Sequence, residues 1–263
     1  MGERTPKRGA GGAQTSAGDP ARTLSLLWRQ PGDGQASRGP RQRTTVDAVV
    51  AAAIEVADSE GLSALTIRSV AAGLGITPMA TYTYVAGKAE LLDLMLDTVY
   101  QQMPRATLSG MPWREKVSVI AEENRGMFER HPWVASVATT RPPLGPGMMA
   151  KYEHELLAFD GVGLSDVEMD AALTYVLGFV TSVARIAIDT DRASADSGVS
   201  DRDWWERAAP LLADVLDADR FPLATRVGAA AGERHGSAYS AAHAYEFGLA
   251  RVLDGLAALI DGR

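Results

Sequence analysis

The chain of 263 residues contains no cysteine, which excludes disulfide bonds, thiolate metal sites and a cysteine nucleophile. No uninterrupted apolar run reaches the roughly 18 residues that a membrane-spanning helix needs, and residues 1–20 lack the apolar core of a signal peptide. No stretch alternates between apolar and polar residues for long enough to predict a β-strand. These absences favour an all-α protein that works in the cytoplasm, away from the membrane.

Histidine is scarce as well. The four histidines belong to no metal-binding pair of the H-E-x-x-H type, no hydrolase elbow and no phosphate loop. The segment Glu153-His154-Glu155 concentrates titratable groups, but neighbouring residues on a helix point in different directions, so it makes a poor catalytic site. We therefore predict no catalytic residue, no metal and no other cofactor.

The net charge of −7 is distributed unevenly along the chain. Residues 1–44 carry eight Lys and Arg against three Asp and Glu, a net charge of +5, so the remainder carries −12. This asymmetry indicates a basic arm attached to an acidic body. The arm is either a solvated tail or a contact to nucleic acid.

The arm is rich in Gly, Pro, Ser and Arg, a composition typical of disorder. One short helix is predicted inside it, near residues 19–30. Asp19 and Pro20 form a helix-start signal there, and three apolar residues follow at helical spacing.

From Thr45 onward the apolar residues repeat with helical spacing. Gly61 ends the first helix, and a tight turn that holds Gly75 joins two short helices, the geometry of a helix-turn-helix. Thr77 and Pro78 start the second helix of that pair. The predicted spans are 45–60, 67–74, 78–83 and 89–103.

The rest of the chain is predicted to be helical, with Pro and Gly between the helices. The expected spans are 113–130, 132–138, 146–159, 165–189, 201–217 and 238–261. Three regions follow: the arm at 1–44, a helix-turn-helix domain at 45–90 and a larger helical domain at 91–263.

Residues 65–88, LTIRSVAAGLGITPMATYTYVAGK, closely resemble the DNA-binding signature of the tetracycline-repressor (TetR) family. Residues 89–93, AELLD, are similar to the start of that family's connecting helix, and residues 245–256, YEFGLARVLDGL, to the last helix of the tetracycline repressor's C-terminal domain. The N-terminal extension resembles that of actinomycete antibiotic-cluster and efflux regulators. The resemblance implies a repressor that binds double-stranded operator DNA as a homodimer and is released by a small-molecule effector.

The resemblance places the DNA contacts on the helix-turn-helix. Arg68 suits a bidentate contact to guanine, Met79 and Ala80 suit a thymine methyl, and the Tyr82 hydroxyl and Lys88 ammonium suit phosphates. Tyr82 is alternatively a half-buried core residue, and Met79 a filler on a solvated helix. Thr81 departs from the family pattern, which has a buried Leu or Ile there. The full set is Thr66, Arg68, Pro78, Met79, Ala80, Tyr82, Thr83, Tyr84 and Lys88.

The residues from Thr45 to Lys88 carry a net charge of −2, which attracts phosphates poorly. Three arginines just before the first helix, Arg38, Arg41 and Arg43, are therefore predicted to supply phosphate or minor-groove contacts.

Two long apolar helices, 165–189 and 238–261, form either an intramolecular core or a dimer bundle, and the resemblance favours the dimer. The candidate interface residues are Tyr245, Leu249, Val252, Leu256 and Ile260.

The resemblance places the effector inside the larger domain, where aromatic residues favour a flat, mostly apolar ligand such as an antibiotic or its precursor. Each of these residues is alternatively plain core. Candidate lining residues are Trp113, Phe128, Trp133, Tyr152, Tyr175 and Phe179, with His154 and Arg185 as polar anchors. Phe159 and Trp204 are further aromatic candidates. A helical adaptor is the remaining alternative, and it leaves the reading helix unexplained.

Overall fold

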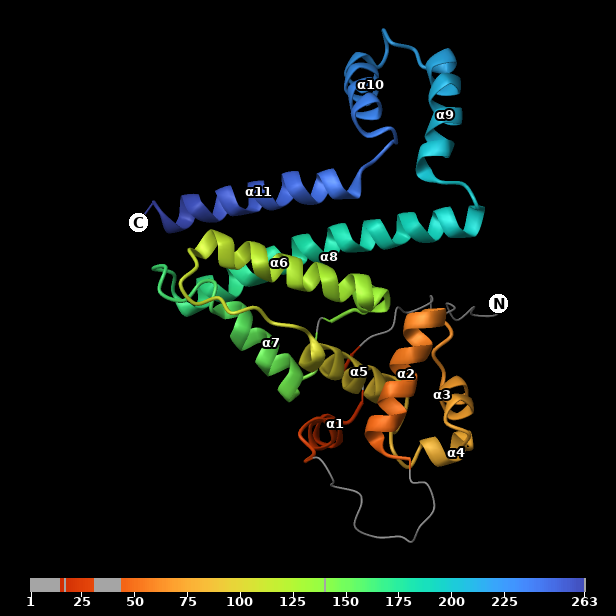
Figure 1. The fold of residues 1–263 in the computed structure, drawn as a ribbon, viewed down its shortest axis with the longest axis vertical. Coiled ribbons are helices and arrows are strands. Elements are labelled where there is room, and N and C mark those ends of the chain that lie inside the picture. Colours follow the sequence, from red (N-terminus) through yellow and green to blue (C-terminus); the bar gives the residue numbers. More distant parts are fainter. Residues whose placement is uncertain (1–14, 17, 31–43, 140, 263) are drawn as a thin grey trace, which may run out of the picture. The chain divides into compact units, whose positions relative to one another are not determined.

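The computed structural model describes residues 15–16, 18–30, 44–139 and 141–262, and these ranges contain helices and no extended strand (Figure 1). The prediction of an all-α fold is therefore confirmed. In chain order the elements are α1 (Pro20–Leu27), α2 (Val46–Glu60), α3 (Ile67–Gly73), α4 (Pro78–Thr81), α5 (Lys88–Gln102), α6 (Trp113–Arg130), the 3₁₀ helix η1 (Pro132–Ser136), α7 (Pro146–Leu156), α8 (Asp166–Ser197), α9 (Asp201–Val215), α10 (Pro222–His235) and α11 (Ala241–Ile260).

Two of these helices differ most from the sequence prediction, and others differ at their ends by up to three residues. Helix α10 was not expected, because Pro222 was interpreted as a helix breaker. In the structure Pro222 begins the helix, where its missing N–H costs nothing and its fixed φ fits. Helix α8 continues to Ser197, beyond the expected end at residue 189.

The chain forms two compact units, residues 1–173 and 174–263, which we describe separately. The first unit holds the helix-turn-helix together with α5, α6 and α7, so the contacts do not separate the predicted domain at 45–90 from the helices that follow it. Helix α8 crosses the boundary between the two units.

The first unit is built around α5, which lies between the α2–α4 group and α7 (Figure 1). Nearly every residue from Glu90 to Tyr100 is buried, including the carboxylates of Glu90, Asp93 and Asp97. Helix α7 approaches α5 backbone to backbone, because a Cβ at Gly147 would lie 2.0 Å from the carbonyl oxygen of Asp97. A side chain at position 147 would therefore force the two helices apart.

In the second unit, small residues bring helices together in the same way. A Cβ at Gly248 of α11 would meet the Phe179 ring of α8 at 2.3 Å, and one at Gly232 of α10 would meet the Trp205 indole of α9 at 2.7 Å. Phe179 also stacks on Tyr245, with ring centroids 6.0 Å apart. Helices α8 and α11 thus pack against each other, and so do α9 and α10.

Within the described residues, α8 is long and apolar enough to cross a membrane when judged by length and composition alone. Only 28% of its most apolar window is buried. The core helix of a soluble protein can have the same length and composition. Much of the apolar face of α8 is exposed in the single chain, so another element or molecule has to cover it.

Candidate functional site

The second helix of the helix-turn-helix, α4, is a single turn with a strong start signal. The Thr77 side chain accepts a hydrogen bond from the Ala80 N–H at 3.2 Å, and Pro78 occupies the first position. Gly75 turns the chain with φ of +65°, a conformation that favours glycine. Thr81, at the position where the family has Leu or Ile, is fully buried and anchors the turn.

Two of the predicted base and phosphate contacts project from this helix. Met79 is 76% exposed and Tyr82 is 49% exposed, which argues against core roles for both side chains. Pro78, Thr83 and Arg68 are exposed beside them, whereas Ala80 and Tyr84 are half-buried. The α3–α4 pair therefore presents a mixed apolar and polar surface to solvent.

Two predicted contact residues already serve the local structure. The Thr66 side chain caps α3 and forms a reciprocal capping box with Ser69, with both bonds at 2.9–3.0 Å. The Thr83 hydroxyl donates to the Ala80 carbonyl at 2.6 Å.

Lys88 binds the loop between α2 and α3 rather than extending into solvent. Its Nζ donates to the carbonyl oxygens of Leu62 and Leu65 at 3.1 and 2.8 Å, and burial lowers its pKa. Lys88 thus ties the first turn of α5 to the helix-turn-helix, and one ammonium hydrogen remains for a phosphate.

The predicted arm arginines Arg38, Arg41 and Arg43 lie outside the described residues. Two other arginines of the basic arm are paired within the protein: Arg22 with Glu90 at 3.0 Å, and Arg29 with Asp47. The net charge of +5 therefore overstates the positive charge that the arm offers to DNA.

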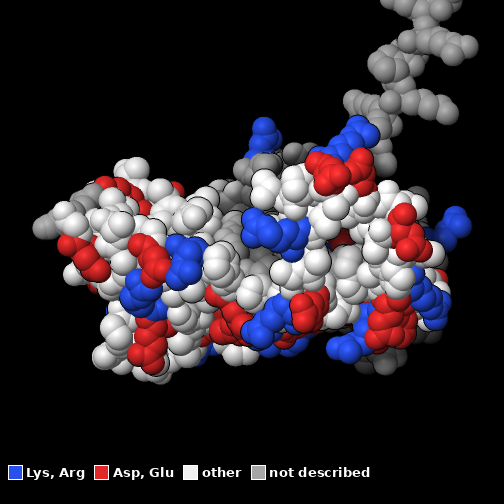
Figure 2. Space-filling model, turned by 90° about the horizontal axis from the view of Figure 1, so that it is seen from above, with Lys and Arg blue, Asp and Glu red and all other residues white. Residues whose placement is uncertain are grey.

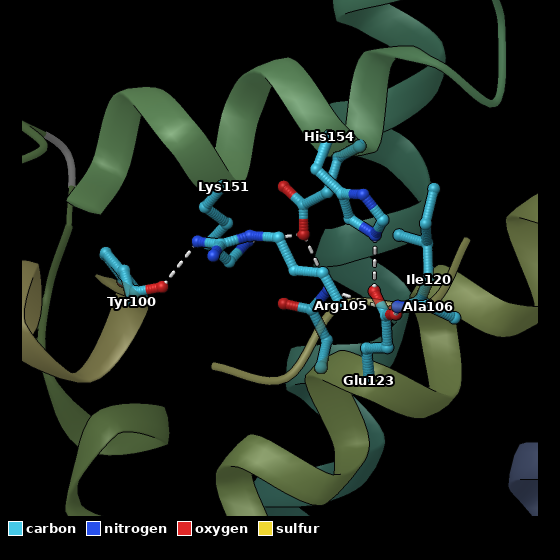
Figure 3. Close-up of polar contacts among 9 residues, drawn as sticks. Tyr100, Arg105, Ala106, Ile120, Glu123, Lys151 and His154 are labelled. Carbon is cyan, nitrogen blue, oxygen red and sulfur yellow. Dashed lines mark hydrogen bonds and ion pairs between the residues drawn. The ribbon is translucent and has the colours of Figure 1, made fainter. Parts of the chain in front are cut away.

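A second candidate site is a largely buried polar cluster between the α5–α6 connection, α6 and α7, in which side chains from several elements point toward one another (Figure 3). We call it the polar cluster. Its members are Arg105, Glu123, Asn124, Lys151, His154 and Glu155.

Glu155 is the centre of one half of the polar cluster. It is 1% exposed, and its Oε1 accepts hydrogen bonds from Lys151 Nζ and Asn124 Nδ2, both at 2.6 Å. Lys151 is 5% exposed and its ammonium also lies 5.5 Å from the centroid of the Tyr100 ring. Burial, with the nearby carboxylates of Glu155 and Asp97, raises the Tyr100 pKa, so its phenol stays neutral.

The other half of the polar cluster joins His154 to Glu123, whose atoms Nε2 and Oε2 lie 2.8 Å apart. Glu123 Oε1 also accepts from the Ala106 N–H at 2.6 Å. One Arg105 nitrogen donates to the Tyr100 carbonyl at 2.6 Å, while its Nε is buried without a hydrogen-bond partner. Because a buried unpaired donor costs about 1–3 kcal/mol, the Arg105 Nε–H is suited to donate a hydrogen bond to an acceptor on a bound molecule.

The structure brings only one predicted effector residue, His154, into the polar cluster. Trp133 is 1% exposed and donates from Nε1 to Asp58 of α2 at 2.7 Å, so it joins η1 to the helix-turn-helix. The Tyr152 hydroxyl donates to Asp170 at 2.8 Å. Phe128 and Phe159 are buried, Trp113 and Phe179 are half-buried, and Tyr175, Arg185 and Trp204 are exposed.

A groove of about 790 Å³ lies elsewhere, between α2 and α5, with Arg29 and Asp47 among its lining residues. Among the described residues, no group of three or more His, Asp or Glu side chains is arranged to hold a metal ion.

The predicted dimer residues of α11 do not share one environment. Tyr245, Val252 and Leu256 are buried in the single chain, as the intramolecular alternative requires. Leu249 and Ile260 are half-buried, whereas the more exposed apolar side chains on this helix are Phe247 at 57% and Leu259 at 40%.

Sequence reasoning missed Arg105, Glu123, Asn124, Lys151 and Glu155. The Lys151–Glu155 spacing is that of an ordinary exposed helical ion pair. Asn124 and Glu155 meet across 31 positions of sequence, so no local signal marks either of them.

Comparison with known proteins identifies the family. The family model described as "Tetracyclin repressor-like, C-terminal domain" matches residues 108–260. A curated relative, the HTH-type transcriptional repressor DrrR1 of Streptomyces coeruleorubidus, is 39% identical over 259 residues, which cover 97% of this chain and 92% of the relative. The chain belongs to the tetracycline-repressor family. This confirms the resemblance, and with it that the chain is a DNA-binding transcription regulator and not an enzyme.

Solved structures of the TetR-family protein ActR from Streptomyces coelicolor are similar over most of their length. ActR in complex with actinorhodin has a TM-score of 0.69 at 27% identity, covering 84% of this chain and 98% of ActR. Apo ActR has a TM-score of 0.65 at 27% identity, covering 82% and 98%. The overall architecture of the chain is therefore similar to that of ActR.

Asp97 links the polar cluster's helix to α5, because its Oδ1 accepts the Met148 N–H at 2.8 Å in the first turn of α7. Burial raises the pKa of this carboxyl, and the hydrogen bonds to the α7 backbone together with Arg29 only partly oppose the rise. The folded protein therefore holds the proton to higher pH than the unfolded chain does. The stability that Asp97 contributes is greatest at low pH and is lost as pH rises from about 4, the ordinary aspartate pKa, through the raised value.

We expect Asp97→Asn to remove the loss of stability that ionisation of Asp97 causes at higher pH, while keeping an oxygen acceptor for the Met148 N–H. The free energy of unfolding of the variant, relative to the unmodified protein, should increase as the pH rises from about 4 to about 7. Urea titrations at several pH values measure it, with exposed Asp160→Asn as control. A difference that stays constant with pH contradicts the assignment.

Proposed function

We propose that this protein is a repressor that binds a pseudo-palindromic operator as a homodimer and is released by a small, largely apolar effector with polar groups. The observation that carries the proposal is a continuous mechanical connection. Helices α2–α4, which we call the head, present the exposed helix α4 and are fixed to α5 by Lys88. Helix α5 packs against α7, which bears Lys151, His154 and Glu155 of the polar cluster. Such a regulator works in the cytoplasm, where its DNA target lies.

The reading surface supports sequence-specific DNA binding. Met79 offers an apolar contact to a thymine methyl, and Tyr82 a hydroxyl to a phosphate, from neighbouring exposed positions. The region from Thr45 to Lys88 has a net charge of −2, so phosphate attraction has to come from elsewhere. Arg38, Arg41 and Arg43 are the proposed source, since Arg22 and Arg29 are paired within the protein.

Met79→Ala should relax the preference at one base pair by about 1–3 kcal/mol, because it removes a contact to a base edge. Tyr82→Phe should weaken binding to all sequences alike, because it removes a phosphate contact. Gel-shift titrations on the upstream region of the protein's own gene, first located by footprinting, measure both effects.

Tyr152→Phe, which removes a hydroxyl bound to Asp170, is the matched control and should bind like the unmodified protein. Neutralising Arg38, Arg41 and Arg43 together should flatten the slope of log affinity against log salt by about 2–3 units per protomer. Wild-type operator binding by both the Met79 and the Tyr82 variants rejects this reading surface.

The polar cluster is the proposed anchor for the effector's polar groups. The buried Lys151 and the half-buried Arg105 suit acidic hydroxyls or carboxylates on a planar ligand, and the buried, unpaired Arg105 Nε offers a donor. ActR, a family member of similar fold, is described in complex with actinorhodin. We therefore propose an aromatic polyketide of that kind, an antibiotic or its precursor, with an efflux or biosynthetic gene under control.

Arg105→Gln should weaken binding of actinorhodin about tenfold or more, because it removes a charge-assisted hydrogen bond. Calorimetric titration measures the affinity, with the exposed Arg125→Gln on α6 as control. By thermodynamic linkage, operator DNA has to lower actinorhodin affinity by the factor by which actinorhodin lowers operator affinity. Equal affinities of the Arg105 and Arg125 variants reject the polar cluster as the anchor, and no binding by the unmodified protein rejects the ligand class.

A homodimer accounts for the exposed apolar surface of the second unit. Tyr175 and Ile186 on α8, with Phe247 and Leu259 on α11, are each at least 40% exposed. The face drawn in Figure 2 shows charged side chains separated by broad uncharged stretches. Exposed apolar side chains on two packed helices are typical of protein interfaces, and a second copy of the chain covers them and places two heads on two half-sites.

Phe247→Arg combined with Leu259→Arg should yield a folded monomer, because both side chains are exposed in the single chain and a dimer would bury two unpaired charges. Sedimentation at micromolar concentration measures the state. Leu157→Arg, at an exposed apolar position of the first unit, is the control and should leave the dimer intact. A monomeric unmodified protein, or a dimeric double variant, contradicts this interface.

A further inference from the structure

The N-terminal residues 15–16 and 18–30, which we call the strap, dock on the first unit along α5. At the start of the strap, Thr15 is buried and its hydroxyl donates to the Arg141 carbonyl at 2.6 Å. The Ser16 N–H donates to the fully buried Asp93 carboxylate of α5 at 2.9 Å. The strap therefore begins as an integral part of the unit.

The middle of the strap, α1, supplies the partner for a second buried acid of α5. Arg22 Nε lies 3.0 Å from Glu90 Oε2, and Glu90 is 3% exposed. Glu90 also accepts the Ala86 N–H at 2.9 Å, just before α5 begins. Removing Arg22 leaves Glu90 with an incomplete set of donors. This is costly, because a buried carboxylate needs hydrogen-bond or charged partners.

The end of the strap reaches two further elements. The Trp28 indole N–H donates to the Leu144 carbonyl at 2.8 Å, in the loop that leads into α7. The next residue, Arg29, pairs with Asp47 in the first turn of α2. Adjacent residues of one short segment thus hold the head on one side and the approach to the polar cluster's helix on the other.

We propose that the strap clamps the head to α5 and to the loop before α7, so that the head and the effector-binding helices move as one body. This inference rests on the proposed release of the operator by an effector. Coupling between distant sites is carried by packed side chains, hydrogen-bond networks and rigid elements that have two discrete arrangements. A free strap would let α5 shift relative to the head and to α7, and a bound effector would then move the heads less.

Two properties distinguish the clamp from a solubility tail. Its contacts include buried acids of α5, and they are made to α2, to α5 and to the carbonyl groups of Ala138, Arg141 and Leu144 rather than to one neighbour. The clamp also differs from a phosphate-binding arm, because Arg22 and Arg29 form ion pairs with Glu90 and Asp47 of the protein itself.

The test compares three full-length variants. Arg22→Met with Trp28→Ala opens the clamp. Arg22→Met with Glu90→Gln also breaks the Arg22 link, but the amide keeps an acceptor for Ala86 and leaves no buried unpaired charge. Arg226→Gln, on an exposed position of α10, removes one positive charge without touching the strap.

The first readout is the distance between the head and the rest of the first unit. Ser63→Cys and Asp160→Cys introduce two exposed labelling sites into a chain that has no cysteine of its own. Spin labels, with labelled protein diluted in unlabelled chain, report the distance distribution within one protomer. We expect a narrow distribution for the unmodified protein and for Arg226→Gln, and a broader one for both strap variants.

The second readout is the factor by which actinorhodin weakens operator binding. We expect this factor to fall about three- to tenfold in both strap variants, within the range of ordinary coupling energies. Arg22→Met with Glu90→Gln should regain unfolding stability over the other strap variant but not regain the coupling. A role in stability alone would restore both.

Unchanged distance distributions in both strap variants overturn the clamp. A broadened distribution with an unchanged actinorhodin factor overturns its part in the switch. If actinorhodin leaves operator binding of the unmodified protein unchanged, the proposed effector fails, and the distance measurement still decides whether the strap fixes the head.

Discussion

The burial of a charged helix is the constraint on which the first unit depends. Helix α5 carries Glu90, Asp93 and Asp97 on positions that the fold removes from solvent. Each carboxylate needs donors where it lies, and each finds them in a different segment: Arg22 and Ala86 for Glu90, Ser16 for Asp93, and Met148 for Asp97.

This requirement explains why segments far apart in sequence meet at one helix. The strap, the end of the helix-turn-helix and the first turn of α7 all donate to the acids of α5, so none of them moves without breaking a hydrogen bond to a buried carboxylate. The backbone contact at Gly147 makes the α5–α7 joint rigid as well. A regulator that transmits a change from a ligand to a DNA-reading head needs such a joint, since closely packed interfaces change between discrete arrangements and do not deform gradually.

The polar cluster likewise buries charged side chains. Lys151 and Glu155 are buried as a pair, and a buried pair of this kind contributes less to stability than its short distance suggests, because both ions lose their hydration. Retaining such a pair beside an unpaired Arg105 Nε is easier to understand for a binding site than for a core. The aromatic residues that the sequence suggested for this role are divided between core and surface instead.

The sequence by itself determined the helices and the reading head, because their signals are local. Caps at Thr45, Thr66 and Thr77, the glycine turn at Gly75 and the apolar spacing are all read within a few residues. The sequence prediction omitted α10 because proline begins some helices and interrupts others, and Pro222 begins this one. Family resemblance added Met79 and Tyr82 as predicted DNA contacts, and both side chains are exposed.

Only the tertiary structure decided which charges are buried and what they bind. The acids of α5 follow a helical spacing that also suits a solvated face, and Lys151–Glu155 has the spacing of a surface pair. In the sequence Arg22 and Arg29 add to the positive charge of the arm, whereas in the structure they are paired with Glu90 and Asp47. Burial and pairing depend on segments far apart in sequence: Arg22 and Glu90 are 68 positions apart, and Ser16 and Asp93 are 77 apart. No local pattern records which distant segment will cover a charge.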